Sequence, residues 1–271
     1  MLFTLTTPVV AVFDTCILFP NILRDTLFRS HRAGICQGHL TADILLELER
    51  NLVAKKAVKD AESARYLIRT IRGNLEEMLV TGYEAHIPHL TCDPKDRHVL
   101  AAAIQANASI IVTVNHKDFP PASLIPHDVV TQSPDAFLLD LFERDCEGMA
   151  KVITKQSRAL WRKPMSVPEV LHGLHQHAPR FVAALFLTMW ASNELPLDRH
   201  TRNLYTTLQH ADPDFSVMDP TTEHLLWAGY DREPDTAKPD TAKPDLSADP
   251  AEAADSAHAG ADTTAADETR P

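Results

Sequence analysis

Residues 8–15 read PVVAVFDT, a continuous apolar and β-branched run that ends abruptly at an acidic residue. Such a run is typical of a strand buried on both faces of a parallel sheet. SIIVTV at 109–114 has the same character, DVVT at 128–131 predicts a third, short strand, and GHLT at 38–41 is too short to predict one. Because helical patterns separate the strands, we expect an α/β fold with a three-layer parallel sheet and helices on both faces.

The segments between these strands carry apolar residues at helical spacing. A helix is expected after Pro20, a second opens at 41–43, and a third covers 60–80. Residues 86–92 are weakly strand-like. The sequence DPKD at 93–96 predicts a helix start, with an acid at the N-cap, proline at the first position and a further acid in the first turn.

The second half of the chain differs in composition from the first. Residues 134–228 read as mostly helical with proline breaks, and a tail rich in Ala, Asp, Pro and Thr follows Tyr230. That tail cannot bury enough apolar surface to order itself. We therefore predict a folded α/β domain at 1–145, a helical extension at 146–232 and a disordered acidic tail at 233–271.

The overall composition is that of a globular protein: 271 residues, 44% hydrophobic and 23% charged, with a net charge of −11. No apolar run approaches the ~18 residues of a membrane span, and the start has no basic region typical of a secretory signal. The four cysteines form no C-x-x-C pair. These features predict a cytoplasmic protein with reduced cysteines and no membrane association. The chain ahead of the acidic tail is only mildly acidic. This is unlike a nonspecific nucleic-acid coat but permits a nuclease.

Acidic side chains gather where the predicted strands end and helices begin. They are Asp14, Glu47, Glu49, Asp93, Asp96 and Asp118. Ligands bind at the carboxyl ends of parallel strands, and an all-oxygen ligand set selects Mg²⁺ or Mn²⁺, which suit phosphodiester hydrolysis.

Several of these acids also have a purely structural explanation. Asp93 and Asp96 are suitable as an N-cap and as a partner of the helix dipole, and Asp118 as a solvated loop residue. Asp14 is harder to explain, since an acid closing a buried strand is costly without a partner. Helical periodicity does not choose between the glutamates at 47 and 49.

Basic residues cluster near the early helices. They are Arg24, Arg29, Arg32, Arg50, Lys55, Lys56 and Lys59. Either they hold RNA phosphates, or they form an ordinary solvated helix face.

Four segments together resemble the PIN-domain family, and within it the VapC-type toxin-related ribonucleases. They are VVAVFDTCIL from residue 9, ELERNL at 47–52, DPKDRHVLAAA at 93–103 and IVTVNHKDFP at 111–120. The resemblance spans residues 8–145 and implies a divalent-metal-dependent ribonuclease with three or four acids in one pocket.

Matched residue by residue, the resemblance implies catalytic roles for Asp14, Glu47, Asp96 and Asp118. Glu47 is favoured over its neighbouring glutamate because it precedes the L-x-R-N-L segment. Metal ligation is implied for the three aspartates of this set, with Asp93 as an outer-sphere neighbour.

The remaining pocket positions are less uniform. Many family members place an acid two residues after the threonine of the second strong strand, where this chain has Asn115. Either Asp118 completes the site, or three carboxylates act with the Asn115 amide. Thr15, Thr113 and Asn115 are expected to position phosphate or water.

The resemblance implies an Mg²⁺- or Mn²⁺-dependent endoribonuclease that hydrolyses RNA phosphodiesters as the toxin of a bacterial toxin–antitoxin pair. Its partners would be RNA and a small antitoxin protein, and a homodimer is compatible with the family. Two alternatives stay open: a catalytically weak PIN-fold module that binds protein or RNA, and a nuclease directed at DNA.

Overall fold

The computed structural model describes residues 8–159, 164–212 and 215–216. Four parallel strands form one sheet in the order β2-β1-β3-β4. They are β1 Val9–Phe13, β2 Cys36–His39, β3 Ile110–Val112 and β4 Val130–Gln132. The predicted parallel α/β fold is confirmed.

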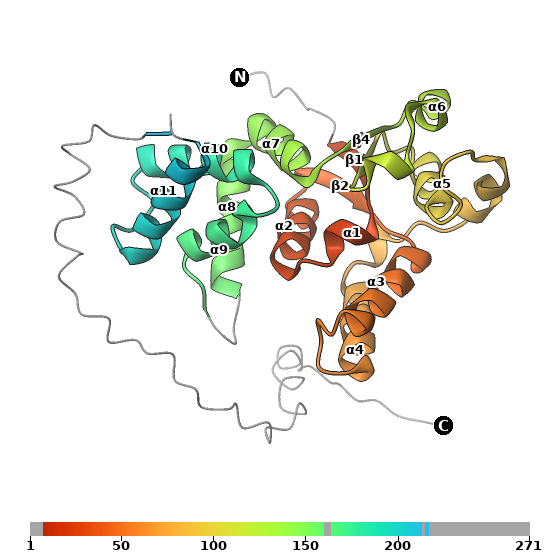
Figure 1. Ribbon diagram of the computed structural model, residues 1–271, viewed down its shortest axis with the longest axis horizontal. Helices are drawn as coiled ribbons and strands as arrows, with labels where there is room; N and C mark the ends of the chain where they lie inside the picture. Colours follow the sequence, from red (N-terminus) through yellow and green to blue (C-terminus); the bar gives the residue numbers. More distant parts are fainter. Residues whose placement is uncertain (1–7, 160–163, 213–214, 217–271) are drawn as a thin grey trace, which may run out of the picture. The chain divides into compact units, whose positions relative to one another are not determined.

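Helices cover both faces of this sheet. Those of the first half are α1 Thr15–Leu18, α2 Asn21–Arg32, α3 Ala42–Ala54, α4 Ala61–Asn74, α5 Arg97–Gln105, α6 Pro121–Leu124 and α7 Pro134–Arg144. Short 3-10 turns are η1 Glu76–Met78, η2 Tyr83–His89, η3 His116–Asp118 and η4 Ile125–His127. Figure 1 shows α2 and α7 on one side of the strands and α5 on the other, as expected for three layers.

Three local predictions differ from the structure. The weak strand at 86–92 is wrong: this stretch lies largely in η2, where Pro88 has no N–H to give a strand ladder. The predicted helix at 60–80 ends at Asn74. The helix expected to open at 93–96 begins only at Arg97, because Asp93 instead caps a turn by accepting a hydrogen bond from the Lys95 N–H.

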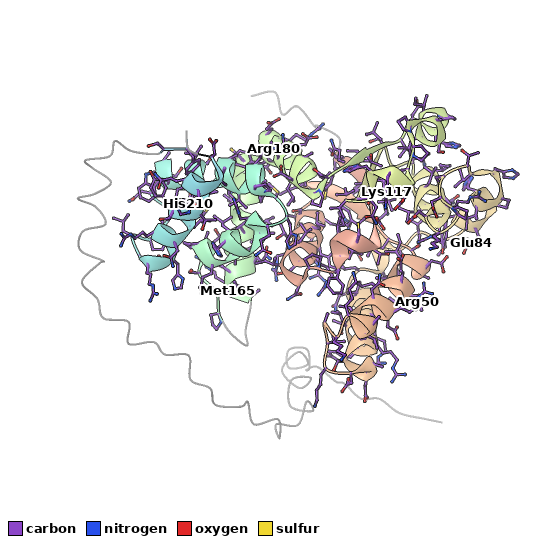
Figure 2. All side chains as sticks on the ribbon, in the orientation of Figure 1. Arg50, Glu84, Lys117, Met165, Arg180 and His210 are labelled. Carbon is purple, nitrogen blue, oxygen red and sulfur yellow. The ribbon has the colours of Figure 1, made fainter. Side chains whose placement is uncertain are left out.

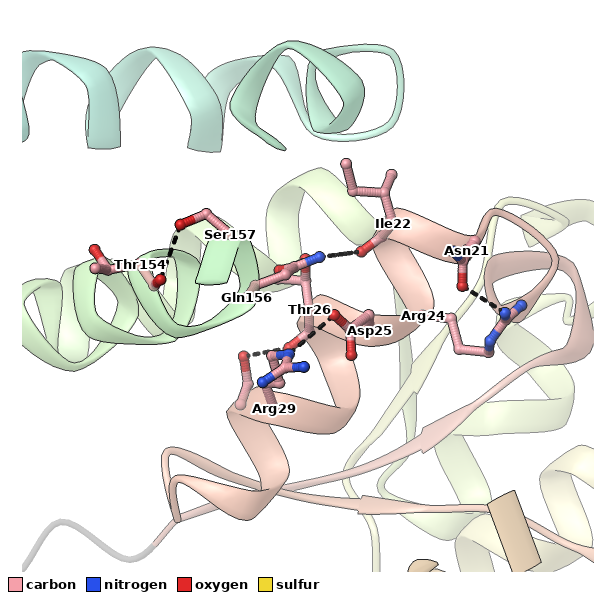
Figure 3. Close-up of polar contacts among 10 residues, drawn as sticks. Asn21, Ile22, Arg24, Asp25, Thr26, Arg29, Thr154, Gln156 and Ser157 are labelled. Atoms are coloured by element: carbon pink, nitrogen blue, oxygen red, sulfur yellow. Dashed lines mark hydrogen bonds and ion pairs between the residues drawn. The ribbon is translucent and has the colours of Figure 1, made fainter. Parts of the chain in front are cut away.

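The helical extension packs against the sheet layer through α2 and α7. It consists of α8 Cys146–Ala159, α9 Val167–His175, α10 Pro179–Ala191 and α11 Arg199–Ala211. Figure 3 shows the buried polar contact between α2 and α8. Thr26 Oγ1 donates to Gln156 Oε1 (2.8 Å), and Gln156 Nε2 donates to the Ile22 carbonyl (3.0 Å). At Gly173 of α9, a Cβ would collide with Ile22, so the glycine permits close packing there.

Contacts between Cα atoms group Met1–Tyr230 into one unit and Asp231–Pro271 into a second. The predicted disordered tail lies outside the described residues, and the domain boundaries at 145 and 232 stay predictions. No helix in the described ranges is long and apolar enough to cross a membrane.

Close packing at β2 makes one glycine a sensitive test of the fold. A Cβ at Gly38 would collide with the Phe13 ring, which is itself fixed edge-on against Phe137 at 5.9 Å. We expect Gly38→Ala to lower the free energy of unfolding by about 1–3 kcal/mol through overpacking. The matched control is Gly73→Ala on exposed α4, where nothing lies within 4 Å.

Because alanine is the better helix former, the control should be neutral or raise stability by up to about 1 kcal/mol. Urea denaturation followed by circular dichroism measures both variants. Equal effects of the two substitutions would contradict the packing described at β2.

Candidate functional site

Asp14 closes β1 and is 3% exposed. Its Oδ2 accepts hydrogen bonds from Thr113 Oγ1 (2.6 Å) and from Cys16 Sγ (3.0 Å). Burial, and after it the Asp14 charge, raises the pKa of the Cys16 thiol to about 12, so the thiol stays protonated and donates. A buried carboxylate that would otherwise be unpartnered is therefore held by two neutral donors.

Glu47 reaches the same region from α3. Its Oε2 accepts a hydrogen bond from the buried Thr15 hydroxyl at 2.8 Å. His98 of α5 lies on the other side, with Nε2 3.9 Å from the same oxygen. That distance is too long for a hydrogen bond, and Nε2 is buried without a partner.

The turn before α5 brings three more carboxylates together. Asp96 N–H donates to the Asp93 carbonyl, and Asp93 N–H donates to the Asp118 carbonyl at 3.2 Å. As a result, ligand oxygens of Asp93, Asp96 and Asp118 lie within 4.8 Å of one another, close enough to bind one metal ion. Among the described residues, no other group of three or more Asp, Glu, Cys or His side chains has its ligand atoms this close together.

The five acids act on one another through their charges. The pKa of Asp96 is raised to about 6, first by burial and then by the negative charges of Asp14, Asp118, Asp93 and Glu47. Among the described residues, the basic group within ion-pair distance of these acids is His98. Since like charges at this density are unfavourable, the arrangement favours a bound cation.

The structure thus brings together the acids predicted from sequence, with two differences in grouping. Asp93, predicted only as an outer-sphere neighbour, lies inside the three-residue group, and Asp14 lies outside it. Glu49 makes no contact with the cluster among the described interactions, whereas its neighbour at 47 does.

Three neutral residues were predicted to position phosphate or water. The Thr15 and Thr113 hydroxyls contact the carboxylates of the site, and Thr113 Oγ1 also accepts a hydrogen bond from the Asn115 N–H at 2.9 Å. Their roles toward a substrate stay predictions. Cys16 and His98 lie inside two of the segments that carry the family resemblance, but the sequence predicts no role for them in the site. Only the folded chain shows that they lie beside the acids.

The part of the chain that carries the acids also matches known proteins. Residues 10–117 match the family described as "PIN domain", and residues 134–186 match "VapC50 C-terminal domain". A protein of Mycobacterium tuberculosis (strain ATCC 25618 / H37Rv) named "Putative ribonuclease VapC50" is 37% identical over 102 residues. The aligned stretch covers 38% of this chain and 60% of that protein, so the chain spans less than two thirds of its relative. No solved structure is significantly similar to the chain.

The parallel sheet, its acidic carboxyl edge and the first match define a PIN domain. The second match and the relative confirm the resemblance to PIN-domain proteins of the VapC type. The second match begins at residue 134 in α7, ahead of the boundary predicted after residue 145.

Burial of Asp96 and repulsion by the neighbouring acids should appear together in the pH dependence of stability. Because the Asp96 pKa is raised from 3.8 to about 6, the folded state binds this proton more tightly than the unfolded state. Stability without metal is therefore lost as pH rises from about 4 through 6. We expect Asp96→Asn to raise the free energy of unfolding at pH 7.5 by on the order of 1 kcal/mol, since partial exposure screens the effect.

Urea denaturation in EDTA at pH 4.5 and 7.5 measures this difference. The variant should gain more stability over the wild type at the higher pH than at the lower one. A gain of equal size at both values would show that ionisation of Asp96 is not its cause.

Proposed function

We propose that the chain is an Mg²⁺-dependent endoribonuclease that hydrolyses RNA phosphodiesters, the toxin of a bacterial toxin–antitoxin pair. The main support is the convergence of four other carboxylates on Asp96, whose pKa is raised to about 6 by burial and then by their charges. Acids whose pKa values are perturbed in this way by burial and by one another are typical of catalytic and metal sites. The relative named as a ribonuclease supports RNA as the substrate.

The residues present fit a hard divalent cation. The donors are carboxylate oxygens from Asp93, Asp96 and Asp118, with Asp14 beside them, and such donors suit Mg²⁺ or Mn²⁺. When bound, the ion would neutralise phosphate charge and promote attack by water. In this proposal Asp14, Asp96 and Asp118 hold the metal, and Asp93 contributes directly or through water.

The other side chains prepare the reactants. Glu47 orients or deprotonates the attacking water, and Thr15 fixes its carboxylate through the 2.8 Å hydrogen bond. Thr113 fixes Asp14. Asn115 adds a neutral amide at the edge of the pocket, suited to holding phosphate or water without adding charge.

Loss of one carboxylate charge should abolish cleavage. We expect Asp96→Asn to lower the rate by roughly 10²–10⁴-fold, because it weakens metal binding and transition-state stabilisation together. Glu47→Gln should lower the cleavage rate by a similar factor. Its matched control is Glu49→Gln on the same helix, which also removes one charge but has no contact with the cluster.

The assay uses purified full-length chain, a pool of structured RNAs, and Mg²⁺, Mn²⁺ or EDTA in parallel. Cleavage that is equal in wild type and Asp96→Asn would contradict the proposed site. Cleavage of DNA in preference to RNA would favour the alternative nuclease. Metal binding without cleavage of any RNA in the pool would favour the catalytically weak binding module.

A further pair of variants tests which residue completes the metal site. If Asp118 is a ligand, Asp118→Asn should weaken Mn²⁺ binding by at least about 10-fold in calorimetry, since an anionic donor becomes neutral. Adding Asn115→Asp to this variant should restore binding if position 115 can supply the acid. Unchanged affinity in Asp118→Asn would exclude Asp118 as a ligand.

The proposed partners follow from the proposed function. RNA is the substrate, and a small antitoxin protein would mask the acidic edge of the sheet. A homodimer is compatible with the VapC type. Adding such an antitoxin should stop cleavage and leave a stable complex in gel filtration.

A further inference from the structure

The proposed reaction leaves an electrostatic question open. Five carboxylates surround the site, and one divalent cation neutralises only part of their charge. A polyanionic RNA is repelled by such a pocket at a distance. Attraction of the substrate must therefore come from a separate basic surface, and most nucleic-acid affinity comes from contacts to phosphates.

A strongly basic stretch lies at residues 50–74. It contains seven basic and two acidic residues in a protein whose net charge is −11. The basic residues, here called the basic hairpin set, are Arg50, Lys55, Lys56, Lys59, Arg65, Arg69 and Arg72. All seven are exposed, and within the described ranges none takes part in an ion pair.

The set lies on α3, α4 and their connection. These helices pack side by side, and Figure 1 shows them as a hairpin beside the sheet. The three arginines of α4 are spaced by four and three residues, which aligns them on one helix face. Beside them Tyr66 is 66% exposed, an uncommon exposure for a large aromatic ring.

The hairpin is directly connected to the candidate site. Glu47 belongs to α3, and Arg50 lies one turn further along the same helix (Figure 2). Lys55 Nζ lies 4.8 Å from the centre of the Phe19 ring, and Phe19 caps α1, the short helix that follows Asp14. A strand leaving the site along α3 would therefore meet basic side chains at once.

A second basic region is a weaker candidate. Arg29, Arg32, Lys151 and Lys155 line a cavity of about 510 Å³ between α2 and α8. Arg29 is paired with Asp25, and Lys151 with Glu147. This cavity also lies at the C-terminal end of α2, just before β2 begins. It is therefore near the amino ends of the parallel strands, whereas the acids lie at their carboxyl ends.

We propose that the basic hairpin is the docking surface for single-stranded RNA, with Arg65, Arg69 and Arg72 binding phosphates and Tyr66 stacking on a base. Arg50 and the lysines of the connection lead the strand toward Glu47. Arginine binds phosphate and an exposed aromatic ring stacks on unpaired bases, and this pairing is typical of single-strand recognition. The inference rests on the proposed function, since it names how that site obtains its substrate.

The test measures RNA binding by fluorescence anisotropy, using full-length chain carrying Asp96→Asn to prevent cleavage and a labelled 20-nucleotide RNA of mixed sequence. In this background we compare Arg65→Gln/Arg69→Gln with Lys155→Gln/Arg158→Gln on α8. Both pairs remove two positive charges from exposed helix positions. The hairpin pair should weaken binding roughly 10-fold at low salt and reduce the salt slope by about 1.4. The α8 pair should change neither.

Tyr66 has its own control. Tyr66→Ala should weaken binding roughly 5- to 100-fold, whereas Tyr66→Phe, which keeps the ring, should bind as the parent does. Circular dichroism verifies that each variant is folded. RNA binding equal to the parent in the folded hairpin variants would overturn the inference. So would loss of self-association in gel filtration with RNA binding intact, because the surface would then be a protein interface.

Failure of the proposed function has a different signature. In that case the wild-type chain neither cuts nor binds RNA, while Mn²⁺ binding persists. If the wild-type chain cuts RNA and the hairpin variants bind it normally, only the docking surface is wrong.

Discussion

Repulsion among carboxylates at the carboxyl edge of the sheet is the constraint on which the rest of the site depends. Five acids near one another destabilise the fold unless each is held by a donor or compensated by a cation. The chain uses neutral donors: Thr113 and Cys16 for Asp14, and Thr15 for Glu47. Neutral donors fix the carboxylates without cancelling their charge. The site therefore keeps its attraction for a divalent cation.

The acids can be held in this way only if the backbone beneath them is rigid. Asp14 is followed directly by α1, whose last carbonyl, at Leu18, accepts a hydrogen bond from Arg24 Nη1 at 2.6 Å. Arg24 is 7% exposed, so its side chain supports the fold and is not available to RNA. This excludes Arg24 from the basic residues that the sequence offered as contacts to RNA phosphates. Because α2 is in turn bound to Gln156 of α8, the helical extension supports the segment that carries Asp14.

The sequence predicts what depends on neighbouring residues along the chain. The buried run before Asp14 identifies β1, and the similar run at 109–114 identifies β3. Strand β2 escapes prediction, because its sequence CQGH has no β-branched residue and its glycine is required by the distant Phe13 ring. Likewise, the approach of Asp93 to Asp118 depends on a hydrogen bond between two loops, which no local pattern encodes.

Charge separation explains why most of the basic hairpin set lies on α4 and on the α3–α4 connection, away from the acids. Arginines inside the pocket would pair with its carboxylates and replace the cation. On α4, away from the acids, they keep their charge free for phosphates. Asn115 fits the same division, since an acid there would add repulsion at a site where burial and the neighbouring charges already raise the Asp96 pKa to about 6. A neutral amide at this position limits the number of cations needed for balance, which favours one metal ion over two.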